Sequence, residues 1–403
     1  MKKSEFYANA RNDLDGPLHG VTVVEATTTW AGPMAGCVLA DFGARVIKVE
    51  HPAGEVIRRL PPIIPDSNLT VVNETVNRNK ENVSLNLGHV QGRELFLQLC
   101  ETADIVIENF RPGTMAGWGV GYQDVAAVNP SIVYVSISGF GQFGTLSDRV
   151  GYDPIAQAFC GWVSLNGETN GEPVKAPTYL GDDTAGLHGA LGAMAALRHR
   201  DQTGEGQHVD VALVDGLLFQ SDGFPTAAAV GVPMERSGNE FSVAAPANNY
   251  NCRDGRVFAG VLLDTHWQLL ANEMGREDLV GLKVTERLAR RDEVDGLLAA
   301  WCAERTTADV VDIFAELGLP AIRVNTYAEV IQEEHLSSRD MMLPTVLANG
   351  ETVPIVGPAA KFSRTPTTIR KPASALGENN AEVLGALGVD QAELTRLKAE
   401  GVV

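Results

Sequence analysis

Short apolar runs alternate with helix-like segments along the first half of the chain. Four runs rich in Val and Ile are predicted to be strands: Val21–Glu25, Arg45–Glu50, Ala103–Asn109 and Ile132–Ser138. Three segments between them carry helical patterns: Pro33–Gly43, Gly92–Cys100 and Tyr122–Val128. Strands that alternate with helices predict a parallel, doubly wound sheet, and nearly continuous apolar strands fit a sheet covered on both faces. We therefore expect an α/β fold with a Rossmann-like large domain.

The second half begins with a Gly- and Ala-rich helix, predicted from Thr184 to about Arg198. Gly186, Gly189 and Gly192 lie three residues apart in it, and because glycine lowers helix stability, this spacing indicates very close packing. A strand at Val209–Leu213 and a loop-like stretch at about 219–245 follow, then a hairpin at Tyr250–Leu263 and helices at His266–Gly275, Arg290–Arg305, Thr307–Leu317, Asn380–Leu387 and Gln391–Glu400.

The composition is that of an ordinary globular protein of 403 residues, 44% hydrophobic and 21% charged. This length predicts two domains. The net charge of -19 disfavours nonspecific nucleic-acid binding, so a polyanionic ligand would need a local basic cluster. The first residues lack the apolar core of a signal peptide, no apolar run could span a membrane, and the five cysteines show no zinc or CxxC spacing. We therefore expect a soluble protein of the reducing cytoplasm, without a metal or a membrane partner.

Two adjacent carboxylates, Asp182 and Asp183, stand at the predicted start of the Gly- and Ala-rich helix. Unpaired N–H groups and the positive end of the helix dipole stabilise an ionised carboxylate there, which makes it a usable nucleophile. Asp is also among the commonest capping residues, and local sequence alone favours that role. His188 lies six residues after Asp182, a spacing that does not place both side chains on one helix face, so it is expected to pack rather than to act with Asp182.

The segment Gly139–Gly144 reads GFGQFG and follows a predicted strand. A dinucleotide site needs a helix at the last glycine, but a polar, turn-like segment follows, so a glycine-rich loop is expected. The sequence has no GxxxxGK[ST], GxSxG or HExxH motif. Trp30 and Arg111 follow predicted strands, where doubly wound sheets bind ligands. Arg111 is either a phosphate ligand or a solvated loop residue, and Trp30 either contacts a ligand or packs.

Taken together, several segments resemble the class III CoA-transferase family, which includes carnitine and formyl-CoA transferases and the α-methylacyl-CoA racemases. They are AGPMAGCVLADFGARVIKVEHP (31–52), NRNKENVSLNL (77–87), DIVIENFRPG (104–113), SGFGQFG (138–144), GYDPIAQAFCGW (151–162), LGDDTAGLHGALGAMAALRHR (180–200), TGEGQHVDVALVDG (203–216) and EVLGALGVDQAELTRLKAEGVV (382–403). The resemblance covers almost the whole chain and is weakest at about 225–340.

The resemblance implies a doubly wound α/β large domain built from both chain ends, a smaller α+β domain, and an interlocked homodimer. The expected parts are 1–218 for the N-terminal part of the large domain, 219–245 for a linker, 246–325 for the small domain, and 326–403 for a second linker and the returning C-terminal part.

The resemblance also implies the site. The family's nucleophilic aspartate matches Asp182, which leaves Asp183 as a cap or a supporting group. CoA would move from an acyl-CoA to a small carboxylic acid through a mixed anhydride and an aspartyl-CoA thioester, without a metal or nicotinamide. Backbone N–H groups near GFGQFG or at the helix start would stabilise the oxyanions. The family's contacts with coenzyme A match Trp30, Ala31, His51, Leu85, Asn86, Asn109, Phe110, Arg111, Tyr152 and Asp153.

The chain departs from the family pattern in two places. Many relatives carry Arg at the position of His51 and a basic residue near Gly117, so phosphate contacts are expected from neighbours such as Lys48, Arg58 or Lys80. The segment VAAPANNYNC (243–252) lacks the glycine run of formyl–oxalate members, which favours the carnitine-type branch.

Other functions stay open from the sequence. An α-methylacyl-CoA racemase needs a His before the Asp, but here Tyr152 precedes Asp153, and a Tyr of ordinary pKa is a poor base at neutral pH. An isomerase that moves CoA between two carboxyl groups of one acid uses the same aspartyl chemistry. A nicotinamide oxidoreductase is a remote alternative that rests on GFGQFG alone. The identities of the two acids stay open as well.

Overall fold

The computed structural model describes residues 1–403. The chain forms two compact units, each with its own hydrophobic core. The first comprises Met1–Trp162, Lys175–Gly231 and Glu334–Val403, and the second comprises Val163–Val174 and Val232–Glu333.

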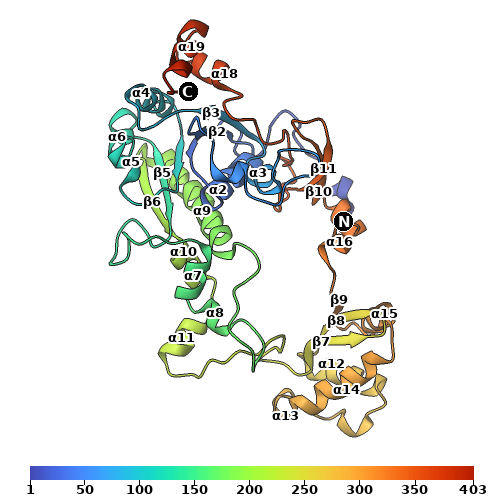
Figure 1. Cartoon of the computed structure of the whole chain (residues 1–403). Coiled ribbons are helices and arrows are strands. Elements are labelled where there is room, and N and C mark those ends of the chain that lie inside the picture. The colour runs from blue at the N-terminus through green and yellow to red at the C-terminus, as the bar shows by residue number, and fades with distance from the viewer. The chain divides into compact units, whose positions relative to one another are not determined.

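A six-stranded parallel sheet forms the centre of the first unit (Figure 1). Its strands are β1 Thr22–Ala26, β2 Arg45–Glu50, β3 Lys80–Ser84, β4 Ile105–Glu108, β5 Val133–Ser138 and β6 Gln207–Ala212. Their spatial order is β3-β2-β1-β4-β5-β6, and every neighbouring pair is parallel. In this doubly wound order the winding reverses between β1 and β4, where such sheets bind ligands at the carboxyl ends of the strands. The predicted α/β class is confirmed.

Helices cover both faces of the sheet, because successive strand residues point to opposite sides. Val23 and Val46 belong to one core, with α2 (Ala31–Asp41), α9 (Leu180–Thr203) and α10 (Leu213–Phe219). Val24 and Ile47 belong to the other, with α4 (Val90–Cys100), α5 (Thr114–Gly117) and α6 (Tyr122–Val128). The alternation explains why the strands read as continuous apolar runs.

The helices α2 and α9 lie against each other on one face of the sheet (Figure 1). A Cβ atom added at Gly186 of α9 would lie 2.8 Å from the Cβ of Met34, and one at Gly189 would lie 2.7 Å from Cδ1 of Ile137. Both distances are shorter than a side chain tolerates, so the predicted close packing at these glycines is confirmed.

The C-terminal segment returns to the edge strand β3. The N–H of Asn82 donates to Oδ1 of Asn379 at 2.9 Å, and the N–H of Ser84 donates to Oδ1 of Asn380 at 2.9 Å. The segment continues through α18 (Asn380–Gly385) and α19 (Gln391–Ala399), whose apolar residues join the same core as α4. These contacts occupy edge donors that would otherwise be free to pair with another chain.

Shorter elements complete the first unit: α1 Lys3–Phe6, η1 Val56–Arg58, α3 Val71–Val76, α7 Asp153–Phe159, α11 Phe224–Ala229, α17 Glu334–Ser338, β10 Met342–Val346 and β11 Thr352–Val356. The short helix α8 is Trp162–Leu165. No helix combines the length and the apolar character that crossing a membrane requires.

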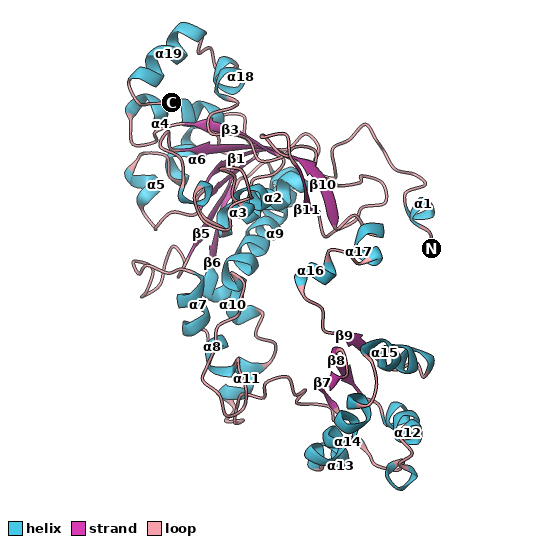
Figure 2. Cartoon of the chain, turned by 45° about the vertical axis from the view of Figure 1, so that its right-hand side comes forward, coloured by secondary structure: helices cyan, strands magenta, loops and turns pink.

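The second unit contains a three-stranded antiparallel sheet with helices around it (Figure 2). Its elements are β7 Ala247–Cys252, β8 Gly255–Gly260, α12 Asp264–Glu273, η2 Glu277–Leu279, α13 Val284–Ala289, α14 Arg291–Ala303, α15 Thr307–Glu316, β9 Ala321–Arg323 and α16 Tyr327–Val330. The strands β7 and β8 form the predicted hairpin, shifted toward the N-terminus. Trp267 and Phe314 are fully buried in the core of this unit.

Three of the differences from the predicted elements lie in the first unit. No strand was predicted at Lys80–Ser84 (β3), where Lys80, Asn82 and Ser84 alternate with other residues, yet all three are buried among polar partners. The helix α9 begins at Leu180 rather than at Thr184. The stretch expected to be a loop after residue 219 contains the helix α11.

Candidate active site

Two loops meet at the point where the winding of the sheet reverses. One follows β1 and contains Thr28 and Trp30, and the other follows β4 and begins with Asn109. Asn109 joins them, since its Oδ1 accepts from the N–H of Thr28 and its Nδ2 donates to the carbonyl of Thr28, both at 2.8 Å. The loops therefore form one wall at the place where a doubly wound sheet is expected to hold its ligand.

Two cavities lie at this wall and share Thr29, Trp30, Tyr152 and Asp182. The first, here called the apolar cavity, has a volume of about 120 Å³ and is lined by Thr29, Trp30, Ile57, Leu60, Val72, Tyr152, Asp153, Pro154, Tyr179 and Asp182. The second, here called the arginine cavity, has a volume of about 240 Å³ and is lined by Thr28, Thr29, Trp30, Ala31, Asn109, Phe110, Arg111, Pro112, Ile137, Ser138, Gly139, Ser147, Arg149, Val150, Gly151, Tyr152, Asp182 and Leu213.

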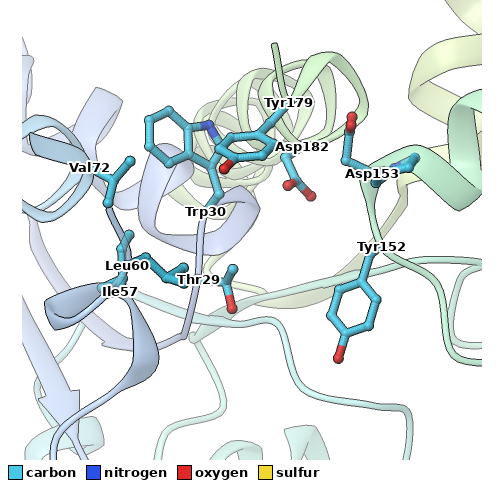
Figure 3. A pocket seen from close by; sticks show the side chains of 10 residues that line it. Thr29, Trp30, Ile57, Leu60, Val72, Tyr152, Asp153, Tyr179 and Asp182 are labelled. Atoms are coloured by element: carbon cyan, nitrogen blue, oxygen red, sulfur yellow. The ribbon is translucent and has the colours of Figure 1, made fainter. Parts of the chain in front are cut away.

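Asp182 is the charged group that both cavities have in common. Its carboxyl group points into the space between Trp30 and Thr29 on one side and Tyr152 on the other (Figure 3). It is the third residue of α9, so it lies beside the positive end of the helix dipole. A thioester carbonyl held where the two cavities meet would therefore lie close to this carboxyl group.

Neither aspartate of the pair caps α9, because the helix begins before them and Tyr179 occupies the cap position. The helix start is instead held by Asp153, whose Oδ1 accepts from the N–H of Gly181 at 2.6 Å. The other oxygen of Asp153 accepts from Nε2 of Gln157 at 2.8 Å. Capping from a distant residue leaves the Asp182 carboxyl free to face the cavities.

Burial, Asp153 and Asp183 together raise the pKa of Asp182 to about 7. Asp183 itself accepts a hydrogen bond from Nε1 of Trp30 at 2.6 Å. Burial raises the pKa of Asp183 as well, and the bond from Trp30 opposes that shift. The two neighbours thus differ in role, since Asp183 is tied to the loop after β1 and Asp182 is not.

The walls of the apolar cavity are mostly hydrocarbon. The rings of Trp30 and Tyr179 lie 5.4 Å apart, and Ile57, Leu60 and Val72 complete that side (Figure 3). No Lys or Arg lines this cavity, and its two charged groups, Asp153 and Asp182, are both acidic.

The segment that reads GFGQFG forms a loop after β5, as expected, and no helix begins at its last glycine. The N–H of Gly141 donates to Oγ of Ser138, and that of Gln142 donates to the carboxylate of Asp210. Both amides are therefore engaged within the protein and are not available for an oxyanion in this structure.

The arginine cavity contains two guanidinium groups, those of Arg111 and Arg149. Neither makes an ion pair or a side-chain hydrogen bond, although the chain carries 51 acidic side chains against 32 basic ones. By contrast, Arg78 and Arg200 each bind an aspartate at 2.6 Å. Unpaired guanidinium groups beside a cavity are suited to bind an anionic ligand.

The neighbours named as possible phosphate contacts hold carboxylates instead. Lys48 and Lys80 are 1% exposed, and both bind Glu25, at 3.3 and 2.7 Å. Arg58 binds Glu50 at 2.7 Å. The expectation is therefore wrong for Lys48 and Lys80, because buried ammonium groups cannot reach a phosphate in solvent.

The same ion pairs support the loop after β1. Lys48 also binds Oε1 of Glu55 at 2.9 Å, and Oε2 of Glu55 accepts from the N–H of Thr29 at 2.9 Å. Thr29 has a φ of 68°, a conformation that costs energy for a β-branched residue. The buried ions thus hold a strained backbone at the position that places Trp30 beside Asp183.

The structure brings most of the predicted site residues together. Seven line the arginine cavity, namely Trp30, Ala31, Asn109, Phe110, Arg111, Tyr152 and Asp182, and Asp153 lines the apolar cavity. Three line neither: Leu85 is buried in the core, His51 accepts a hydrogen bond from the N–H of Ala53, and Asn86 accepts one from the N–H of Gly88. His188 packs against Phe219, with ring centres 5.2 Å apart, as expected.

Several cavity residues could not be found from the sequence. Tyr179 and Leu60 lie in irregular segments without a pattern, and Arg149 lies in a polar loop. The role of Asp153 at the start of α9 is also a tertiary feature, because 28 residues separate it from Gly181. No group of three or more His, Cys, Asp or Glu side chains is arranged to hold a metal ion.

Comparison with known proteins gives consistent matches over nearly the whole chain. A family model described as CoA-transferase family III matches residues 18–380. The chain is 35% identical to the "Succinyl-CoA--L-malate CoA-transferase beta subunit" of Chloroflexus aurantiacus, over 96% of this chain and 98% of that protein. It is 33% identical to the "Succinyl-CoA:mesaconate CoA-transferase" of Haloarcula marismortui, over 93% and 97%. It is 32% identical to the "Succinate--glutarate CoA-transferase" of Agrobacterium fabrum, over 92% and 96%.

Solved structures match as well. A CAIB/BAIF family protein from Brucella suis superimposes with a TM-score of 0.83 at 30% identity, over 93% of this chain and all of that one (100%). The protein Rv3272 of Mycobacterium tuberculosis gives a TM-score of 0.81 at 28% identity, over 92% and 99%.

Proposed function

The chain belongs to CoA-transferase family III, and from this premise we propose that Asp182 is the nucleophile of a CoA transfer between two carboxylic acids. The observation that carries the proposal is the position of the Asp182 carboxyl group, which is the charged group common to both cavities at the reversal of the sheet. Family membership excludes the nicotinamide oxidoreductase considered from the sequence, and it makes the enzyme a CoA-transferase.

The proposed reaction has four steps. The carboxylate of Asp182 attacks the thioester carbonyl, a C–O bond forms, the C–S bond breaks, and the CoA thiolate leaves a mixed anhydride. The thiolate attacks the aspartyl carbonyl, which yields an aspartyl-CoA thioester and the free first acid. The second acid attacks that thioester, giving a new mixed anhydride and the thiolate. The thiolate then attacks the new acyl carbonyl, which forms the product and restores Asp182.

We place the pantetheine arm of CoA in the arginine cavity, with Asn109, Phe110 and Arg111 on one side of it. Support comes from the two unpaired guanidinium groups in a chain with a net charge of -19. Contacts of CoA with His51, Leu85 and Asn86 stay predictions of the family resemblance.

We propose succinyl-CoA, or a similar dicarboxylic thioester, as the donor. The three named relatives carry succinyl or succinate in their names, and their other substrates are malate, mesaconate and glutarate. The nearness to the carnitine-type branch stays a prediction. No observation favours racemisation, since both oxygens of Asp153 accept hydrogen bonds within the protein.

We also propose that the protein is a homodimer, as the resemblance implies. Support comes from the second unit, where a cavity of about 580 Å³ is lined by mostly apolar residues. Phe241, Leu262, Leu263 and Ile322 of this lining are more than half exposed in the single chain. Apolar surface of this extent suits an interface with a second copy.

The central experiment compares two neighbouring variants. Asp182→Asn should lower CoA transfer by more than about 10³-fold, because the attacking oxygen is lost. Asp183→Asn should retain measurable transfer, because that carboxyl group binds Trp30 and lines neither cavity. Transfer is followed as exchange of CoA between a thioester and a labelled acid, and hydroxylamine added during turnover should label Asp182 in the wild type. Transfer that persists in Asp182→Asn would overturn the proposal.

A second arm of the experiment separates transfer from racemisation. One enantiomer of a 2-methylacyl-CoA, incubated in deuterated water, should gain no deuterium at the α-carbon above background. Rapid α-deuteration without CoA exchange would assign Asp182 or Asp153 to acid–base chemistry instead.

A further inference from the structure

We propose that Arg149 binds the second carboxylate of a dicarboxylic acyl group and thereby makes the enzyme select dicarboxylic over monocarboxylic acids. The inference rests on the proposed function and extends it to a residue that determines specificity. It begins from a physical requirement: a carboxylate that leaves water for a protein cavity needs a cation or several hydrogen-bond donors beside it.

The apolar cavity cannot meet this requirement. Trp30, Ile57, Leu60 and Val72 offer hydrocarbon walls, and its charged groups are the carboxyl groups of Asp153 and Asp182. A second carboxylate placed there would lose its water and meet like charges. The charged end of a dicarboxylic acyl group therefore has to lie on the other side of Asp182.

The arginine cavity lies on that side and offers two cations, Arg111 and Arg149. Arg111 follows β4 directly after Asn109 and Phe110, in the group of residues that we assign to CoA. Arg149 lies in another segment, three residues before Tyr152, which lines both cavities. Of the two guanidinium groups, that of Arg149 therefore belongs to the segment that borders the junction at Asp182.

The loop that carries Arg149 is held at several points. Its two ends touch at the backbone, since a Cβ atom added at Gly139 would lie 2.8 Å from Cα of Gly151. Near the start of the loop, the N–H of Gln142 binds Asp210 at 3.0 Å, and near its end the N–H of Arg149 donates to the carbonyl of Leu146 at 2.9 Å. Because the backbone of the loop is already held, binding of an anion by Arg149 has to order only its side chain.

The test uses CoA exchange between a thioester and its own isotope-labelled acid, so that donor and acceptor are the same compound. Succinyl-CoA with succinate is compared with butyryl-CoA with butyrate, two acids of equal length that differ in the second carboxylate. Wild-type enzyme should favour succinyl-CoA in kcat/KM. Arg149→Met should lower the succinyl-to-butyryl ratio by about 10- to 100-fold, as expected for loss of a charge-assisted hydrogen bond. Arg149→Lys should restore part of the ratio.

Two further variants serve as controls. Arg198→Met removes an exposed arginine 16 residues beyond Asp182 on the same helix, outside both cavities, and should leave the ratio at the wild-type value. Arg111→Met should lower both exchanges by a similar factor, because CoA is common to them, and so should keep the ratio.

Four results would overturn the assignment. Because unfolding would also lower both exchanges, the circular dichroism of Arg149→Met is compared with that of Arg149→Lys. Equal losses for both acids in Arg149→Met would make Arg149 a CoA contact, and a changed ratio in Arg111→Met would move the role to that residue. Wild-type enzyme that does not favour succinyl-CoA would show that no such selection exists, while transfer itself would stand. Exchange that persists with both acids in Asp182→Asn would instead overturn the proposed function, and the assignment with it.

Discussion

At the scale of single residues, three carboxyl groups near the start of α9 have three different environments. Asp153 accepts hydrogen bonds from Gly181 and Gln157, Asp183 accepts one from Trp30, and Asp182 faces the cavities. Burial raises the pKa of Asp182 most, and the neighbouring carboxyl groups of Asp153 and Asp183 raise it further. A nucleophile with a raised pKa is less ionised at neutral pH but more reactive once ionised.

This environment predicts an acid limb in the pH profile. The pKa of Asp182 is about 7 in the free enzyme, so kcat/KM should fall as the pH drops below that value, because the protonated group cannot attack. The effect on the free energy of unfolding has the opposite sign to that of a salt-bridged aspartate. Because the pKa of Asp182 is higher in the folded chain than in the unfolded one, this group stabilises the fold below about pH 4, and the contribution is lost as the pH rises through about 7.

Asp153→Asn tests the cause of the limb. The asparagine oxygen can still accept from the N–H of Gly181, whereas the negative charge that raises the pKa of Asp182 is gone. The acid limb of kcat/KM should therefore move to lower pH, and Asp183→Asn should move it in the same direction. An unmoved limb in both variants would mean that a different group controls the profile.

At the scale of elements, the loop after β1 depends on ions contributed by two strands and a loop. Glu25 lies in β1, Lys48 in β2 and Glu55 beyond β2, and all three are buried. Burial disfavours the charged form of Lys48, but Glu55, Glu25 and Glu50 outweigh it, so the pKa of Lys48 is raised. The strained loop at Thr29 is therefore fixed by a charged network, and a hydrophobic core could not supply the hydrogen bond to its N–H.

Lys48→Met should destabilise the protein by about 3–5 kcal/mol, because Glu55 would stay buried without a cation and Glu25 would keep only Lys80. The surface pair of Arg45 and Glu81 gives the matched control on the same strand, and Arg45→Met should cost less than about 1 kcal/mol. Urea unfolding at pH 7 measures both. Similar midpoints for the two variants would show that the buried network contributes no more than a surface ion pair.

At the scale of the whole molecule, the first unit is assembled from segments far apart in the chain, since residues 334–403 join residues 1–162 and 175–231. The second unit is formed mainly by the residues inserted between them, 232–333. A chain that leaves one unit and later returns to it can interlock with a second copy, as the family resemblance implies.

An interlocked dimer cannot separate while both chains stay folded, so dimer and fold should be lost together. Sedimentation over a wide range of dilution should show only the dimer, and urea should unfold the protein in a transition that coincides with loss of the dimer. A folded monomer that forms reversibly on dilution would contradict the interlocked arrangement.

The sequence alone predicted the features that local pattern encodes. Apolar runs and helical periods predicted the α/β class and most strands, because a strand covered on both faces must be apolar along its length. The glycine spacing in α9 predicted a close contact, and Gly186 makes one with Met34. Asp182 was singled out by its place near a helix start and by resemblance to a family.

The tertiary structure decided what depends on distant partners. The strand β3 has a polar sequence and could not be predicted, because the partner of Lys80 is Glu25, a residue on another strand of the sheet. The start of α9 is held by Asp153, which accepts a hydrogen bond from the N–H of Gly181. Lys48 and Lys80 form ion pairs with buried Glu25 and are not available to bind a ligand. Arg149 lines the same cavity as Asp182 because the loop after β5 folds back on itself, so that Gly151 lies against Gly139. In each case the free energy comes from charges and hydrogen bonds between residues far apart in sequence, which no local pattern records.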